Sequence, residues 1–144
     1  MSPLAVILSL AACSTAQFIA PGNDAGLQVF RSQNPDSNWT ISYKEPSGIC
    51  QTALETQKQY TGWVDVPGDH PANLFFWFVE AREPTDDLTI WLNGGPGSTS
   101  LFGFFTGLGP CEVFETGMDE FKTLPRQWGW DRASNMLFID QVCI

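Results

Sequence analysis

The stretch that decides the fold is WLNGGPGSTS, residues 91–100. An apolar run ends at Asn93, three glycines follow around Pro96, and small hydroxyl residues come next. Glycine adopts positive φ without strain and has no side chain, so the backbone N–H groups of such a segment can come close to another group. Two interpretations fit these residues: a tight turn that closes a hairpin, and a loop whose backbone contacts a ligand. The flanking segments distinguish the two.

Four apolar runs predict β-strands, because each is short, rich in aromatic or β-branched residues and bounded by turn residues. The first two are joined by residues 67–71 and predict an antiparallel hairpin. The last two are separated by residues 94–135, and a connection of this length joins parallel strands. We expect both of these strands to be central in the complete sheet, whose remaining strands are expected after Gln141, and to be apolar on both faces. The runs are residues 60–66, 73–81, 88–92 and 136–139.

The rest of the chain has weaker patterns. Residues 17–49 are rich in Gly, Asn, Ser and Pro, and we expect them to run over the surface of the core. Residues 100–109, SLFGFFTGLG, are apolar with a weak helical spacing and many glycines. The predicted fold class is therefore α/β, a mixed sheet in which an antiparallel hairpin is followed by parallel strands. A chain of 144 residues provides one modest core.

Charge excludes one class of partner. Sixteen acidic residues against seven basic ones give a net charge of -9, and the sequence pI is near 4.2. Such a surface repels phosphate backbones, so we expect no nucleic-acid partner. The composition suits an extracellular protein that works in mildly acidic surroundings.

The N-terminus predicts export. Residues 4–12 form an apolar run too short to span a bilayer, and the small residues at 14–16 suit cleavage, which predicts a signal peptide over residues 1–16. The alternative is a buried N-terminal helix, since no Lys or Arg precedes Arg31. No later run is long enough to span a membrane, so we expect a secreted protein without a membrane partner, with the vacuole as the second destination. The sequon Asn38-Trp39-Thr40 predicts a glycan on Asn38.

The cysteines and the histidine are not spaced like the ligands of a metal ion. Cys13 leaves with the signal peptide, and Cys50, Cys111 and Cys143 form an odd set, so at least one of them lacks a partner in this chain. Which cysteines pair stays open. No CxxC pair or His/Cys cluster occurs, and we expect neither a metal nor a cofactor. His70, the sole histidine, lies in Gly-Asp-His-Pro and is expected on a solvated loop.

Several segments together resemble one family. Their order matches the N-terminal part of the serine carboxypeptidases, which are α/β-hydrolases, and the likeness to secreted fungal members is strongest. The resemblance extends over residues 43–141 and implies that residues 17–141 are the N-terminal part of such a domain. It also implies release of C-terminal residues from peptides or proteins through an acyl-enzyme. The segments are YTGWVDVP, NLFFWFVEAR, LTIWLNGGPGSTSL, GLGPCEV and WGWDRASNMLFIDQ.

The resemblance assigns roles within residues 91–100, whose part from residue 93 to residue 100 we call the glycine loop. Trp91 and Asn93 take the positions whose side chains hydrogen-bond the C-terminal carboxylate of the substrate, together with the backbone N–H of Gly94. The backbone N–H of Gly95 takes the oxyanion-hole position, where fixed donors stabilise the charge of the acyl-transfer intermediate. Neutral donors recognise a carboxylate without a fixed cation. Without the family, Trp91 reads as core packing and Asn93 as a turn residue.

No catalytic residue is expected in this chain. Ser98, Thr99 and Ser100 do not lie in G-x-S-x-G, and the family's nucleophile lies downstream in Gly-Glu-Ser-Tyr-Ala-Gly, which is absent from these residues. The family's triad follows the order Ser, Asp, His, so His70 is not its histidine. The expected protein is a truncated serine carboxypeptidase that is inactive as written. The alternatives are a non-catalytic secreted binding fragment and a carboxypeptidase-like acyltransferase.

Three departures from the family pattern stand out. Ser98 replaces a frequent cysteine, and Gly107 replaces a glutamate of the carboxylate-binding network, which weakens the expectation of tight carboxylate binding. Residues 142–144 replace the family's continuation after Asp-Gln. Val-Cys can be encoded by GTATGT, a common opening of a fungal intron, so we interpret this tail as lying outside the family and as arising from an unspliced intron.

Overall fold

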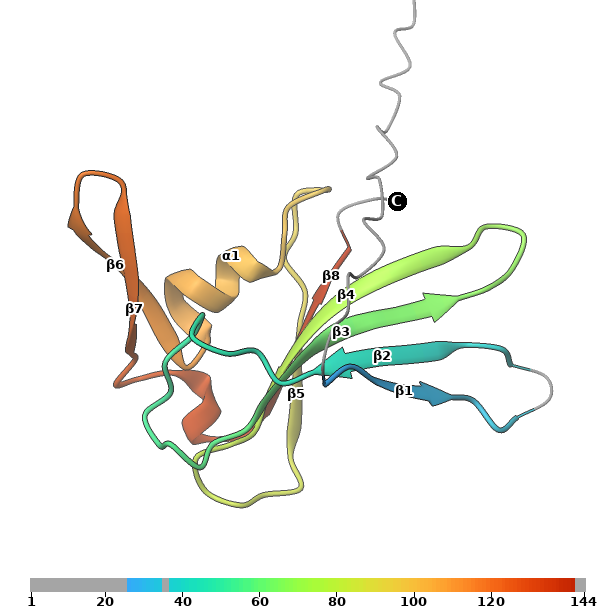
Figure 1. The fold of residues 1–144 in the computed structure, drawn as a ribbon, viewed down its shortest axis with the longest axis horizontal. Helices are drawn as coiled ribbons and strands as arrows, with labels where there is room; N and C mark the ends of the chain where they lie inside the picture. Colours follow the sequence, from blue (N-terminus) through green and yellow to red (C-terminus); the bar gives the residue numbers. More distant parts are fainter. Residues whose placement is uncertain (1–25, 35–36, 142–144) are drawn as a thin grey trace, which may run out of the picture.

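The computed structural model describes residues 26–34 and 37–141 (Figure 1). The predicted signal peptide and the tail at residues 142–144 lie outside the described residues. Within them, three short helical segments occur: α1 (Leu101–Gly103), the π-helical η1 (Phe104–Leu108) and the 3-10 segment η2 (Trp130–Arg132). The described strands are β1 (Gln28–Arg31), β2 (Thr40–Lys44), β3 (Gln59–Val66), β4 (Ala72–Val79), β5 (Leu88–Trp91), β6 (Cys111–Gly117), β7 (Glu120–Pro125) and β8 (Asn135–Asp140).

The main sheet has the order β1-β2-β3-β4-β8-β5. The predicted hairpin is confirmed, because β3 and β4 pair antiparallel over their whole length. The predicted parallel pair is confirmed as well: β5 lies parallel to β8, with Leu88 opposite Asn135 and Trp91 opposite Phe138. The mixed α/β sheet expected from the sequence is therefore present.

Two features were not predicted from the sequence: the strands β1 and β2, and the hairpin β6–β7. Residues 17–49 were expected only to run over the surface of the core, and within them β1 and β2 extend the sheet beyond β3. β5 forms an edge of the described sheet, and the side chains of Leu88 and Ile90 are 52% and 54% exposed; its central position in the complete sheet stays a prediction. The connection after the glycine loop contains a hairpin of its own, β6–β7, that turns through Asp119 at positive φ.

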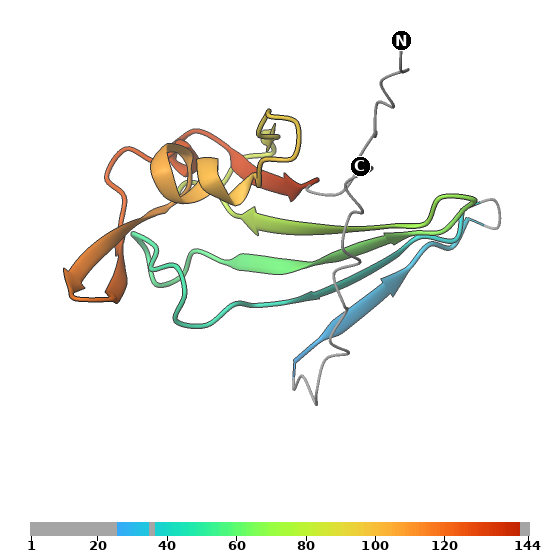
Figure 2. The same ribbon diagram turned by 90° about the horizontal axis from the view of Figure 1, so that it is seen from above.

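The core lies on one face of the sheet. α1 and η1 cover this face, as the view from above shows (Figure 2). Phe104 of η1 is fully buried; its ring lies 4.5 Å from that of Trp77 on β4 and 5.0 Å from that of Phe138 on β8. Burial of each such side chain stabilises the fold by about 1.5–3 kcal/mol. The weak helical spacing of residues 100–109 thus corresponds to the helical segments α1 and η1, which cover the sheet.

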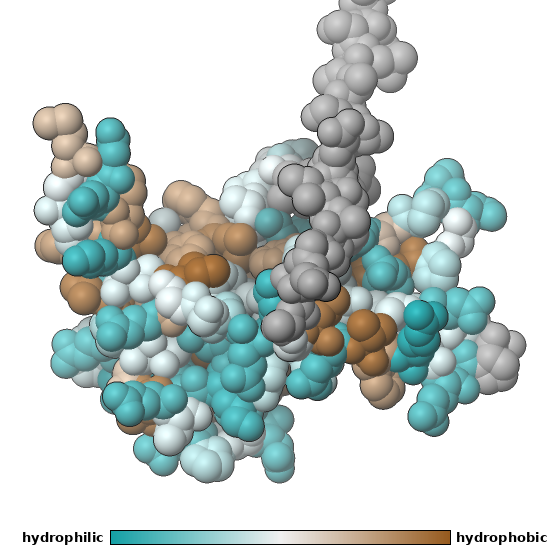
Figure 3. All heavy atoms as spheres, viewed as in Figure 1, coloured by the Kyte–Doolittle hydropathy of each residue, from teal (hydrophilic) through white to brown (hydrophobic). Residues whose placement is uncertain are grey.

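The opposite face is apolar, and no helix of the described part of the chain lies on it (Figure 2). Tyr60, Phe78, Leu137 and Ile90 lie side by side across four strands, because they pair directly in register. A groove of about 540 Å³ on this face is lined by Tyr43, Tyr60 and Phe78 among others. Further hydrophobic side chains are exposed over α1 and the β6–β7 hairpin (Figure 3).

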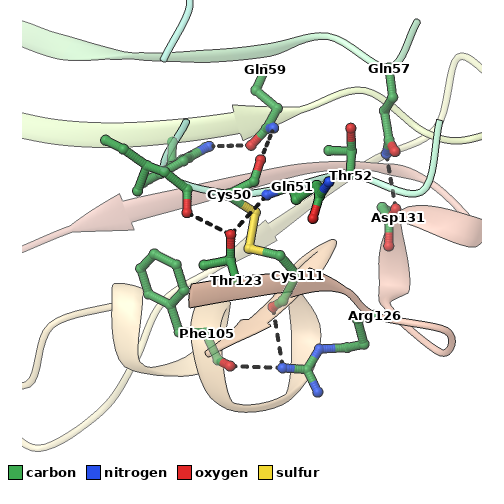
Figure 4. The surroundings of a disulfide bond; sticks show 12 residues. Cys50, Gln51, Thr52, Gln57, Gln59, Phe105, Cys111, Thr123, Arg126 and Asp131 are labelled. Carbon is green, nitrogen blue, oxygen red and sulfur yellow. Dashed lines mark hydrogen bonds between the residues drawn. A yellow bond between two sulfur atoms is a disulfide. The ribbon is translucent and has the colours of Figure 1, made fainter. Parts of the chain in front are cut away.

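A disulfide joins the segment before β3 to the start of β6 (Figure 4). Cys50 and Cys111 are both buried, with a Cα–Cα distance of 5.7 Å. Gln59 Nε2 donates to the Cys50 carbonyl at 2.9 Å, and Thr123 Oγ1 donates to the Ile49 carbonyl at 2.9 Å. The pairing that the sequence left open is therefore Cys50 with Cys111, whereas Cys143 lies outside the described residues.

Candidate functional site

The glycine loop lies where the two parallel strands end. β5 ends at Trp91, β8 ends at Asp140, and the carboxyl ends of parallel strands are a common place for ligand sites in α/β proteins. The loop leads into α1, and the neighbour of β5 is β8, so the loop does not close a hairpin. Gly95 and Gly97 have φ values of 146° and 81°, which favour glycine at both positions.

The loop exposes two backbone donors. Gly94 and Gly95 are both exposed, and within the described residues neither N–H donates a hydrogen bond. A Cβ at Gly94 would meet nothing within 4 Å, so the space beside this residue is open. These two N–H groups are free to bind an acceptor that approaches the loop from outside.

Trp91 and Asn93 form a pair. The indole N–H of Trp91 donates to Oδ1 of Asn93 at 2.6 Å. Because the indole N–H is only a donor, this bond fixes the orientation of the amide and leaves the two Nδ2 hydrogens for another acceptor. No partner for Nδ2 is recorded among the described residues. In the structure Trp91 thus orients Asn93, while Asn93 keeps free side-chain donors.

The indole of Trp91 also packs. It contacts the core cluster, and its ring lies 6.0 Å from that of Trp130 in an edge-to-face arrangement. The core packing weighed for Trp91 is therefore present, whereas a hydrogen bond from its indole to a substrate carboxylate stays a prediction.

Four residues that support the loop were not predicted as site residues: Ser100, Asp140, Gln141 and Gly103. Ser100 Oγ accepts from the Asn93 N–H at 3.1 Å, and Gln141 Nε2 donates to the Asn93 carbonyl at 3.3 Å. The sequence gives no periodic pattern that links positions 93, 100 and 140. Only the abrupt change from the apolar run of β8 to Asp140-Gln141 marks the end of that strand as polar.

Gly103 allows α1 to approach the Trp91–Asn93 pair. A Cβ at residue 103 would lie 2.5 Å from Trp91 Nε1 and 2.8 Å from Asn93 Oδ1. We expect Gly103→Ala to shift the Trp91 indole N–H resonance and to lower the free energy of unfolding by about 1–3 kcal/mol, the usual cost of overpacking. Nuclear magnetic resonance and urea unfolding measure the two effects. Gly107→Ala is the matched control, since a Cβ there meets nothing within 4 Å; equal effects of the two substitutions would contradict the close approach.

Other predicted residues lie apart from the loop. His70 is exposed in the β3–β4 turn, as expected, and Asn38 is exposed in the connection from β1 to β2, where the glycan stays a prediction. The fully buried carboxylate of Asp131 is not available for catalysis, because Arg82 holds both of its oxygens, at 2.7 and 3.1 Å. Gln57 donates to the same carboxylate at 2.9 Å.

The described residues form neither a metal cluster nor a membrane-spanning helix. They contain no group of three or more His, Cys, Asp or Glu that is arranged to hold a metal ion. None of their helices has the length and apolar character needed to cross a membrane.

The chain is similar to proteins of a known family. The family model for serine carboxypeptidases matches residues 47–143. Carboxypeptidase S1 homolog B of Arthroderma otae is 40% identical over 149 residues, which cover 95% of this chain and 22% of that protein. Carboxypeptidase Y of Schizosaccharomyces pombe is 35% identical over 122 residues, which cover 83% of this chain and 11% of that protein. The chain thus spans about a fifth of the length of the first of these relatives.

Proposed function

Since the chain belongs to the serine carboxypeptidase family, we propose that it supplies the substrate-carboxylate and oxyanion half of an enzyme that releases C-terminal residues from peptides. The observation that carries the proposal is the set of unpaired donors on the glycine loop. The N–H groups of Gly94 and Gly95 and the Nδ2 group of Asn93 donate to no described residue, and they lie within three consecutive residues at the end of β5.

Each donor has a proposed task. Asn93 Nδ2 and the Gly94 N–H bind the terminal carboxylate of the peptide, and Trp91 holds the Asn93 amide in the donating orientation. The Gly95 N–H binds the oxygen that becomes negative when a serine attacks the scissile carbonyl. A single donor of this kind contributes about 2.7–4 kcal/mol to transition-state stabilisation in other serine hydrolases. The proposal assigns neither the attacking serine nor its base to a residue of this chain.

A second candidate is acyl transfer by a carboxypeptidase-like acyltransferase. One observation favours it: Gly107 stands where the family resemblance predicts a glutamate of the carboxylate-binding network. Gly107 is exposed, and the space around it is open to 4 Å. An enzyme that accepts esters without a free carboxylate has less need of that side chain.

Export is part of the proposal. The Cys50–Cys111 disulfide supports it, because stable disulfides form mainly in secreted proteins and in oxidising compartments. The exposed sequon at Asn38 is consistent with passage through such a compartment. We place the protein outside the cell, with the vacuole as the second destination.

The test of carboxylate recognition is Asn93→Ala in the protein expressed from its complete coding sequence. We expect kcat/KM for blocked dipeptides with a free C-terminus to fall about 10–150-fold, because a hydrogen bond to a charged group contributes about 1.5–3 kcal/mol. C-terminal amides and esters of the same peptides should lose far less. Asn73→Ala, an exposed position at the start of β4, is the matched control. Equal losses for acids and amides would mean that Asn93 only shapes the turn.

A further inference from the structure

The backbone of Asn93 is held from two sides. Its N–H donates to Ser100 Oγ at 3.1 Å, and its carbonyl accepts from Gln141 Nε2 at 3.3 Å. Between Asn93 and Ser100 the loop is glycine-rich and largely exposed, so it cannot fix its own conformation. The spacing of the loop donors therefore depends on what holds Ser100 and Gln141.

Ser100 is held by the last residue of β8. The Ser100 side chain is fully buried, and its backbone N–H donates to Asp140 Oδ1 at 3.3 Å. Thr99 Oγ1 donates to Asp140 Oδ2 at 2.7 Å and accepts from the Leu101 N–H at 3.2 Å. The Asp140 carboxylate thus accepts one hydrogen bond from Thr99 and one from Ser100. A carboxylate suits this role because each of its two oxygens is an acceptor.

We propose that Asp140 and Gln141 are positioning residues for carboxylate recognition. Together they hold both ends of the glycine loop. Gln141 holds Asn93 directly, whereas Asp140 holds Thr99 and Ser100, and Ser100 Oγ in turn holds the Asn93 N–H. This inference rests on the proposed function of the loop. Neither residue binds the substrate; both set the distance between Asn93 and the glycine N–H groups.

Asp140 is well suited to hold the loop because it belongs to a strand that is paired on both sides. Asp140 is the last residue of β8, which pairs with β4 on one side and with β5 on the other. Phe138, two residues earlier, is fully buried in the core. Misplacement of a binding group by about 1 Å costs on the order of 100-fold in rate, so a firm attachment of the loop to a central strand has a measurable consequence.

Two variants test the inference in the protein expressed from its complete coding sequence. Thr99→Val removes the hydroxyl that donates to Asp140 while keeping the shape of the side chain, and Asp140→Ala removes the acceptor itself. We expect amide hydrogen exchange at Asn93 and Ser100 to become about tenfold faster in both variants, the change that corresponds to one lost hydrogen bond. We also expect the preference for peptide acids over peptide amides, in kcat/KM, to fall about tenfold.

Two controls separate positioning from general damage. Thr99→Ser keeps the hydroxyl and should restore both readouts. Thr123→Val makes the same substitution at a threonine whose hydroxyl holds the Ile49 carbonyl, remote in sequence from the loop, and should leave both readouts unchanged. Thr99→Val also covers the case in which Asp140→Ala fails to fold.

The outcomes are distinct. Unchanged exchange at Asn93 in Thr99→Val would overturn the inference, and so would faster exchange with an unchanged preference for acids. If the unsubstituted protein has no preference for acids over amides, the proposed function fails. Faster exchange in the variants would then still support Asp140 as the residue that holds the loop.

Discussion

The 144-residue polypeptide, produced by itself, should hydrolyse no blocked dipeptide and should take up no serine-directed phosphonylating reagent. The sequence contains no G-x-S-x-G motif, and its one histidine, His70, is exposed in the β3–β4 turn without a serine partner among the described hydrogen bonds. In subtilisin, loss of the triad lowers kcat about 10⁶-fold and leaves only the effect of the oxyanion hole and of binding. Mass spectrometry after incubation with the reagent measures the labelling.

The control is a serine carboxypeptidase of known activity, which should be labelled stoichiometrically under the same conditions. Ser98 is the one residue of the Ser-Thr-Ser run whose hydroxyl has no recorded hydrogen bond in the described chain. Stoichiometric labelling that disappears in Ser98→Ala would contradict the prediction and would place a nucleophile inside the glycine loop.

Strands were predictable where hydrophobic pattern alone determines them. β3, β4 and β8 are bulky apolar runs between turn residues, and the structure places each within a few residues of the expected bounds. β1 and β2 were missed because they are only four and five residues long and lie among turn-forming residues. β2 exists because it pairs with β3, and a sequence pattern does not contain that long-range pairing.

The position of β5 shows a second limit. Its apolar sequence predicted burial on both faces, but burial depends on neighbours, and the described sheet provides a neighbour on one side only. The β6–β7 hairpin was missed for a different reason. Its strands mix charged and apolar residues, as in Glu112-Val113, because both faces are largely exposed.

The candidate site was predictable only through the family resemblance. The residue types alone predicted glycine N–H groups that a ligand can approach. Only the resemblance identified that ligand as the C-terminal carboxylate of a peptide. The roles of Ser100 and Asp140 could not be inferred either way, because a hydrogen bond between residues 40 positions apart leaves no local pattern. Thr99 and Ser100 were weighed as nucleophiles, whereas in the structure they connect the loop to β8.

Because one face of the described sheet is open, the 144-residue polypeptide, produced by itself, should self-associate. Tyr60, Phe78, Leu137 and Ile90 form an apolar row with no helix over it in the described chain. Soluble monomers rarely expose contiguous apolar patches larger than a few hundred Å². The net charge of -9 opposes association, but it is spread over the surface and does not cover this row.

The edge strand β5 is the expected point of contact. Leu88, Ile90 and Leu92 are each about half exposed, and an edge strand presents unpaired N–H and C=O groups to a second chain. Light scattering should therefore detect oligomers, and urea unfolding should lack a single sharp transition. Ile90→Lys should reduce the oligomers, since it places a charge on the apolar row and on the edge at once.

Val113→Lys on the β6–β7 hairpin is the matched control, because Val113 is 48% exposed and the change in charge is the same. If charge alone governs association, the two lysines should act equally; if the sheet face governs it, only Ile90→Lys should act. A monodisperse monomer with one cooperative transition would contradict the prediction. These 144 residues would then fold as a self-sufficient domain, and a non-catalytic binding module would become the better description of their function.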